Sequence, residues 1–216
     1  VLGGFSFQPV ELAKVGLILM MAYIISRFGR RFEQPLFFFG TFIVTLIMMA
    51  LIMLQPDLGS AVIIGSIWFG LMLLVGARRL FIIALVACGI LVAIFAWHFF
   101  LQDYQKDRVT TFIHPEKDKL DAGYNVYQST IAVGSGKIFG RGLGYGSQSQ
   151  LRFLPETQTD FVFSVIGEEL GLVGVSILLV LYMIILWRIL LIIKNNTDDF
   201  SAITAGGVFI LFFSQF

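Results

Sequence analysis

The sequence predicts an all-α, polytopic helical membrane protein, and two observations support this fold class. Of its 216 residues, 57% are hydrophobic and only 13% are charged, whereas about a quarter of the residues in an average soluble domain are charged. Apolar stretches of roughly 20 residues, the length of a helix that crosses a bilayer, follow one another along the chain. Because the bilayer core offers no water to the backbone, such stretches are expected to be helices.

The expected spans are separated by short polar turns and by one long polar segment. Pro9 and Pro35 suit the first turn of a helix, where a missing N–H is tolerated. The fifth span is long enough to tilt or to extend beyond the bilayer. A single membrane domain over residues 1–216 is predicted, with a large loop at 102–160 and spans at 9–26, 36–54, 60–75, 80–101, 161–191 and, incomplete, 201–216.

The placement of basic residues predicts the orientation. Seven of the eight Lys and Arg residues outside the long loop flank the three turns that share one side if the spans alternate. The positive-inside rule then places these turns in the cytoplasm and loop 102–160 outside. The net charge of +1 gives no reason to expect a nucleic-acid partner.

Ionisable residues inside the first predicted span point to a polar cavity. Glu11 and Lys14 are three residues apart, so they share a helix face and can form an ion pair. Charged groups at membrane depth usually line a functional cavity. The alternative is that Lys14 extends to the membrane surface from the end of its helix. Asp57 is expected to cap the following helix.

Asp160 lies where the long loop enters the span 161–191, and desolvating a carboxylate there is costly unless a partner compensates. Glu168 follows eight residues later and shares a helix face with Ser164 and Gly171. Close helix packing accounts for the small residues of this face but not for its acids. We therefore expect Asp160 to do chemistry at the mouth of a membrane cavity.

The loop offers weaker signals. Its stretch Gly140–Gly146 is rich in glycine and contains Arg141, so its backbone N–H groups could hold a phosphate, although such a stretch can equally be a plain loop. His98 and His114 have no Glu or Cys at the spacing of metal ligands, and no metal site is predicted.

Several motifs together resemble the SEDS family, the membrane proteins of the RodA, FtsW and SpoVE type. Residues 7–14 are similar to the family signature FQPSE-x-A-K, with Val10 in place of the usual Ser. Matching segments follow in the order of the family, at 55–60, 122–124, 128–129, 131–136, 148–156, 159–161 and 168–171. The sequence Gln-Ser-Gln-Leu at 148–151 is more similar to that of the elongation branch, RodA, than to that of the division branch.

The resemblance implies an internal fragment of a ten-helix peptidoglycan glycosyltransferase that polymerises lipid II, with about five to six transmembrane helices in this chain. It also implies a bacterial cytoplasmic membrane and a class B penicillin-binding protein as the transpeptidase partner. The essential acid of the family corresponds to Asp160, and its intramembrane pair corresponds to Glu11 and Lys14.

The expected reaction assigns roles to these residues. Asp160 would be the general base that takes a proton from the acceptor sugar. The expected substrate-binding residues are Glu11, Lys14, Arg108, Arg152, Arg141 and Glu168. A divalent cation, Mg²⁺ or Mn²⁺, could share the binding of the diphosphate. Two alternatives remain, a flippase of lipid-linked precursors and a non-catalytic membrane scaffold for a partner synthase.

Overall fold

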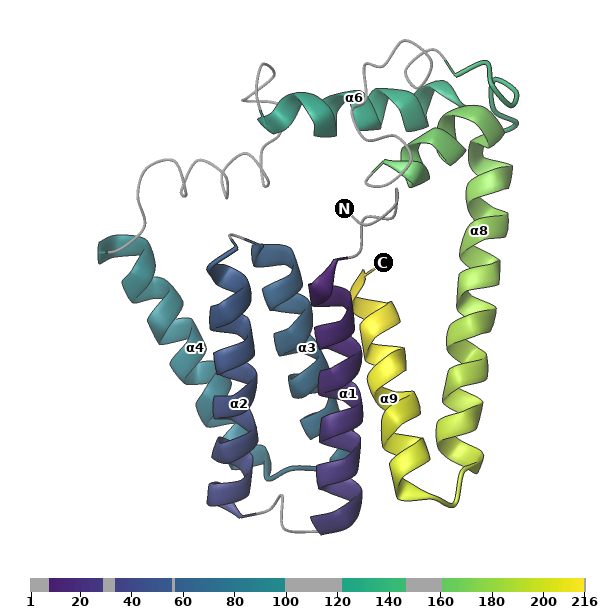
Figure 1. Ribbon diagram of the computed structural model, residues 1–216. Coiled ribbons are helices and arrows are strands. Elements are labelled where there is room, and N and C mark those ends of the chain that lie inside the picture. The colour runs from purple at the N-terminus through teal and green to yellow at the C-terminus, as the bar shows by residue number, and fades with distance from the viewer. Residues whose placement is uncertain (1–7, 29–33, 56, 100–121, 147–160, 216) are drawn as a thin grey trace. The chain divides into compact units, whose positions relative to one another are not determined.

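The structure is a computed structural model that describes residues 8–28, 34–55, 57–99, 122–146 and 161–215. Within these residues every regular element is a helix (Figure 1). The helices are α1 (Pro9–Phe28), α2 (Pro35–Met53), α3 (Leu58–Val75), α4 (Arg79–Phe99), α6 (Ala122–Ser135), α8 (Val162–Asn195) and α9 (Asp199–Gln215). The predicted all-α fold is confirmed.

Four of the described helices, α1, α2, α3 and α8, are long and apolar enough to cross a membrane. Two shorter apolar helical stretches, Arg79–Leu91 in α4 and α9, lie where the sequence predicts a fourth and a last span. The protein is therefore a helical, polytopic membrane protein. The exact limits of the spans and the single membrane domain stay predictions.

The chain forms two compact units, one of residues 1–89 and 184–216 and the other of residues 90–183. In the first unit, α3 packs against α1, α2 and α9, and α1 packs against α9 (Figure 1). The glycines of α9 allow this approach, because a Cβ atom on Gly207 would lie 2.5 Å from Ile18 Cγ2. In membranes, small residues at helix interfaces let the backbones approach closely. This matters because the hydrophobic effect does not drive helices together within lipid.

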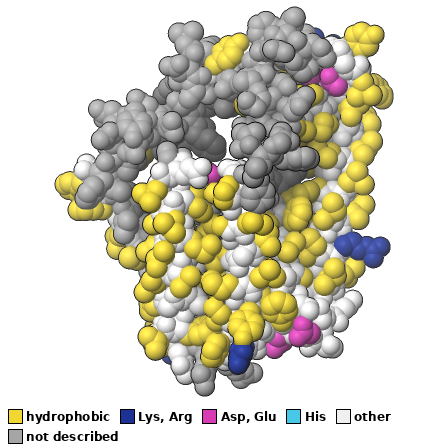
Figure 2. All heavy atoms as spheres, viewed as in Figure 1, with side chains coloured by type: hydrophobic (Ala, Val, Ile, Leu, Met, Phe, Trp, Pro, Cys, Tyr) yellow, Lys and Arg dark blue, Asp and Glu magenta, His cyan; other side chains and the backbone are white. Residues whose placement is uncertain are grey.

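The core of this first unit is apolar, and a buried hydrogen bond joins two of its helices. Leu17, Met21 and Leu71 are fully buried. The indole Nε1 of Trp68 donates a hydrogen bond of 3.2 Å to Thr41 Oγ1, joining α3 to α2. Hydrophobic side chains also cover much of the outer face, as Figure 2 shows. A hydrophobic exterior suits helices that face lipid rather than water.

In the second unit, α6 and the turn after it pack against the beginning of α8. Helix α8 is interrupted at Gly171, whose φ of 66° and ψ of −160° are not helical. The sequence predicts one span over 161–191, whereas the structure divides α8 into the stretches 162–170 and 172–195. The physical reason is that only glycine adopts this backbone conformation without severe strain.

Candidate functional site

Lys14 and Glu11 form the ion pair that their spacing predicts. Lys14 Nζ lies 2.7 Å from Glu11 Oε1, and the side chain of Lys14 is 2% exposed while that of Glu11 is 53% exposed. The ammonium is therefore buried, whereas its carboxylate partner lies at the surface. This burial does not fit the alternative in which Lys14 extends to the membrane surface.

Asp57 adds a second carboxylate near this pair. It caps α3, since its Oδ1 accepts a hydrogen bond of 3.0 Å from the backbone N–H of Ser60, as the sequence predicts. The hydrogen bonds from Ser60 hold the pKa of Asp57 below its usual range, and the positive charge of Lys14 lowers it further. The ammonium of Lys14 on α1 and the carboxylate of Asp57 at the start of α3 are thus close enough to interact electrostatically, at one end of the first unit.

This end of the first unit can stabilise an anion. A buried ammonium acts strongly on a nearby negative group, because little water screens it. The helices α1 and α3 both begin here (Figure 1), and helix N-termini carry partial positive charge. The carboxylates of Glu11 and Asp57 moderate that potential, and the hydrogen bond to Glu11 holds Lys14 in position.

The second unit contains a different polar cluster around Glu168. The side chain of Glu168 is fully buried, and Ser164, four residues earlier on α8, is 4% exposed. The hydroxyl groups of Ser129 on α6 and Ser164 on α8 share a hydrogen bond of 2.6 Å. Among the residues that the structure describes, the buried Oε1 atom of Gln128 accepts no hydrogen bond.

A backbone hydrogen bond joins Arg141 to Glu168. The N–H of Arg141 donates a hydrogen bond of 3.0 Å to the carbonyl oxygen of Glu168. The side chain of Arg141 is exposed. The structure thus brings together two of the predicted substrate-binding residues within the second unit, and it brings Glu11 and Lys14 together within the first.

The other predicted site residues, Asp160, Arg108 and Arg152, lie outside the described residues. In the described part of the chain, no group of three or more His, Cys, Asp or Glu side chains could hold a metal ion.

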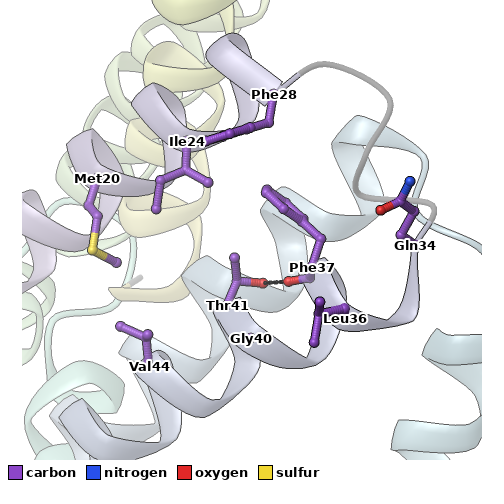
Figure 3. Close-up of a pocket in the computed structure, with 9 residues that line it drawn as sticks. All are labelled: Met20, Ile24, Phe28, Gln34, Leu36, Phe37, Gly40, Thr41 and Val44. Carbon is purple, nitrogen blue, oxygen red and sulfur yellow. Dashed lines mark hydrogen bonds between the residues drawn. The ribbon is translucent and has the colours of Figure 1, made fainter.

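A pocket of about 390 Å³ lies between α1 and α2 and is almost wholly apolar. Figure 3 shows its lining side chains, which are Met20, Ile24, Phe28, Gln34, Leu36, Phe37, Gly40, Thr41 and Val44. None of the predicted site residues belongs to it. An apolar hollow of this kind offers neither a base nor a positive charge, so we do not place the chemistry there.

Two polar features of the second unit were not predicted from the sequence. One is the Ser129–Ser164 hydrogen bond, and the other is the contact of the turn 136–142 with the break in α8. The glycines of this turn and of α8 were the available signal. Sequence spacing alone cannot bring together residues about 30 positions apart, because only the folded chain places them in contact.

Comparisons with known proteins agree with the motifs. The family model for FtsW, RodA and SpoVE, described as "Cell cycle protein", matches residues 1–216. The peptidoglycan glycosyltransferase MrdB of Escherichia coli K12 is 41% identical over 98% of this chain and 57% of its own length. The probable peptidoglycan glycosyltransferase FtsW of Haemophilus influenzae is 35% identical over the whole chain and 55% of its own length.

A solved structure agrees as well. A chain from a study of how a peptidoglycan synthase complex coordinates polymerization and crosslinking matches with a TM-score of 0.78 and 31% identity. The match covers 98% of this chain and 57% of that one, so the chain spans little more than half the length of the proteins that it matches. The chain belongs to the SEDS family of FtsW, RodA and SpoVE proteins.

Proposed function

We propose that this protein is a peptidoglycan glycosyltransferase that polymerises lipid II into glycan strands during cell elongation. The observation that carries the proposal is the 41% identity with a peptidoglycan glycosyltransferase over 98% of the chain. The identity with the FtsW relatives is lower, at 35% for four of them and 32% for a fifth, and this supports the elongation branch.

The proposed reaction is a displacement at the anomeric carbon of a lipid-diphosphate sugar. A hydroxyl oxygen of the acceptor sugar forms the new glycosidic bond while the bond from the anomeric carbon to the diphosphate oxygen breaks. Asp160 takes the proton of that hydroxyl group as general base. The lipid diphosphate departs with an added negative charge, which needs positive groups nearby.

Lys14 is the best supported group for that charge. It is buried, and the hydrogen bond to Glu11 holds its ammonium in place, so little reorganisation is needed when the charge develops. Arg108 is assigned to the same role, with Arg141 and Arg152 as further diphosphate contacts and Glu168 as a polar contact to the substrate. Among the described residues no cluster of three or more His, Cys, Asp or Glu side chains could hold a divalent cation.

The proposal extends to topology and partner. The basic turns would lie in the cytoplasm and loop 102–160 outside the bacterial cytoplasmic membrane, where polymerisation takes place. A class B penicillin-binding protein would be the transpeptidase partner. The match to a chain of a peptidoglycan synthase complex supports this assembly.

The deciding experiment supplies purified lipid II to the protein expressed from its complete gene, with its transpeptidase partner, in detergent. Glycan strands that are absent without the protein are the expected product. A flippase would instead move lipid II headgroups across liposomes without making strands. A scaffold would leave strand formation to the partner, so the partner alone would give the same yield.

A further inference from the structure

The break in α8 leaves backbone N–H and C=O groups without the hydrogen bonds that an uninterrupted helix would give them. Gly171 has φ 66° and ψ −160°, a combination that is essentially confined to glycine. A helix that ends leaves its last carbonyl groups without partners, and a helix that begins leaves its first N–H groups without partners. In an apolar setting each such group is costly, so a break of this kind needs outside partners.

The turn after α6 supplies those partners on both sides of the break. Before it, the carbonyl oxygens of Glu168 and Glu169 each accept a hydrogen bond of 3.0 Å, from the N–H groups of Arg141 and Gly142 respectively. After it, Leu172 N–H donates to Lys137 O at 2.9 Å, and Val173 N–H donates to Ile138 O at 3.1 Å. Four backbone hydrogen bonds therefore join residues 137–142 to the interrupted helix.

The two segments meet so closely that three positions exclude any side chain. A Cβ atom on Gly136 would lie 1.9 Å from the carbonyl oxygen of Gly167. One on Gly140 would lie 2.0 Å from the carbonyl oxygen of Glu169, and one on Gly171 would lie 2.3 Å from Gly140 N. The obstacles are backbone atoms, which cannot move aside as a flexible side chain can.

We propose that residues 136–142 form a clamp on the break at Gly171, which fixes the short helical stretch 162–170 and the buried Glu168 on it for lipid II polymerisation. The stretch is only nine residues long, and a helix this short is not stable alone. The clamp donates a hydrogen bond to the backbone carbonyl of Glu168. It therefore fixes the backbone from which the Glu168 carboxylate extends. Gly136, Gly140 and Gly171 are then positioning residues, in a role that rests on the proposed function.

Two pairs of variants test the clamp, each pairing a change that disrupts it with a control that leaves it intact. Leu172→Pro removes the N–H that donates to Lys137 O, at a first helical position where proline is tolerated. Leu172→Ala keeps that N–H, and the side chain is 60% exposed, so it is the matched control. Gly136→Ala places a methyl group against the Gly167 carbonyl, whereas a Cβ on Gly134 meets no atom within 4 Å, so Gly134→Ala is the second control.

The first measurement does not depend on activity. Amide hydrogen exchange of the whole purified protein should be at least roughly tenfold faster at Arg141 and Gly142 in Leu172→Pro and Gly136→Ala than in wild type, because their bonds to the helix open more often. Both controls should exchange as wild type does. Unchanged exchange in Leu172→Pro would overturn the clamp. If Gly136→Ala does not fold, the Leu172 pair decides alone.

The second measurement asks whether the clamp acts through Glu168. Turnover of lipid II per mole of folded protein should fall by roughly tenfold or more in Leu172→Pro and in Glu168→Gln, since small displacements of a substrate-binding group are costly. The double variant should be no worse than Glu168→Gln alone, because both changes remove the same contribution. Additive losses, or full turnover in either single variant, would overturn the positioning role. If wild-type protein makes no strands, the proposed function fails, and the exchange measurement still decides whether the clamp exists.

Discussion

Lys14 Nζ donates a hydrogen bond of 2.7 Å to Glu11 Oε1, and only the lysine of this pair is buried. This asymmetry is informative. A pair formed for stability alone would gain little from burying one charge, because desolvation offsets the attraction. In the proposed function, this buried ammonium, with its carboxylate at the edge, is available to a second anion, the departing diphosphate.

Replacing Lys14 tests that availability. Lys14→Met keeps the length of the side chain but removes the ammonium, and turnover of lipid II should fall by about 10²-fold or more, as when a group that stabilises developing charge is lost. The amount of protein inserted in the membrane should change little. Lys194→Met, on an exposed lysine at the end of α8, is the control. Failed insertion of Lys14→Met with normal turnover of the inserted protein would make the pair structural.

Asp160→Asn tests the proposed general base. The amide cannot accept the proton of the acceptor hydroxyl group, so turnover should fall by roughly 10²–10⁴-fold while the protein folds and inserts normally. Strand formation from purified lipid II is the readout. Asp199→Asn, on an exposed acid in the first turn of α9, should retain activity. Full activity of Asp160→Asn would remove this residue from the mechanism.

The cap of α3 predicts a dependence of stability on pH. The folded pKa of Asp57 is lowered from 3.8, so its ionised cap stabilises the protein fully above that value and is lost as pH falls through the folded pKa. Asp57→Ala should cost about 1 kcal/mol at neutral pH. Asp57→Asn keeps a capping oxygen and should lack this part of the acid dependence. Thermal melts between neutral and acid pH measure both, and an Asn variant with the wild-type acid slope would refute the assignment.

The hydrogen bond between Trp68 and Thr41 predicts that two Thr→Val substitutions in α2 lower the stability of the protein by different amounts. Thr41→Val leaves the indole N–H of Trp68 buried without this acceptor, at a cost of about 1–2 kcal/mol. Thr45→Val removes only a hydroxyl group that donates to the backbone oxygen of Thr41 within α2, so it should cost less. Unfolding in detergent followed by tryptophan fluorescence compares them, and equal losses would contradict the role given to the indole bond.

Local features of this protein were predictable because their causes lie within a few residues. The Glu11–Lys14 pair follows from a spacing of three on one helix, and the Asp57 cap spans three residues. Membership of the SEDS family follows from short motifs in order along the chain, and the family model confirms it. Asp160, Arg108 and Arg152 stay predictions, since they lie outside the described residues.

The sequence by itself determined the membrane fold class, the family and the polar contacts between neighbours on one helix. Only the tertiary structure decided where α8 is interrupted and which segment compensates for the interruption. Gly171 permits a break but does not require one, because glycine also occurs inside continuous helices. The break exists where the turn 137–142 bonds the freed backbone groups on both sides, and that turn reaches them only in the folded chain.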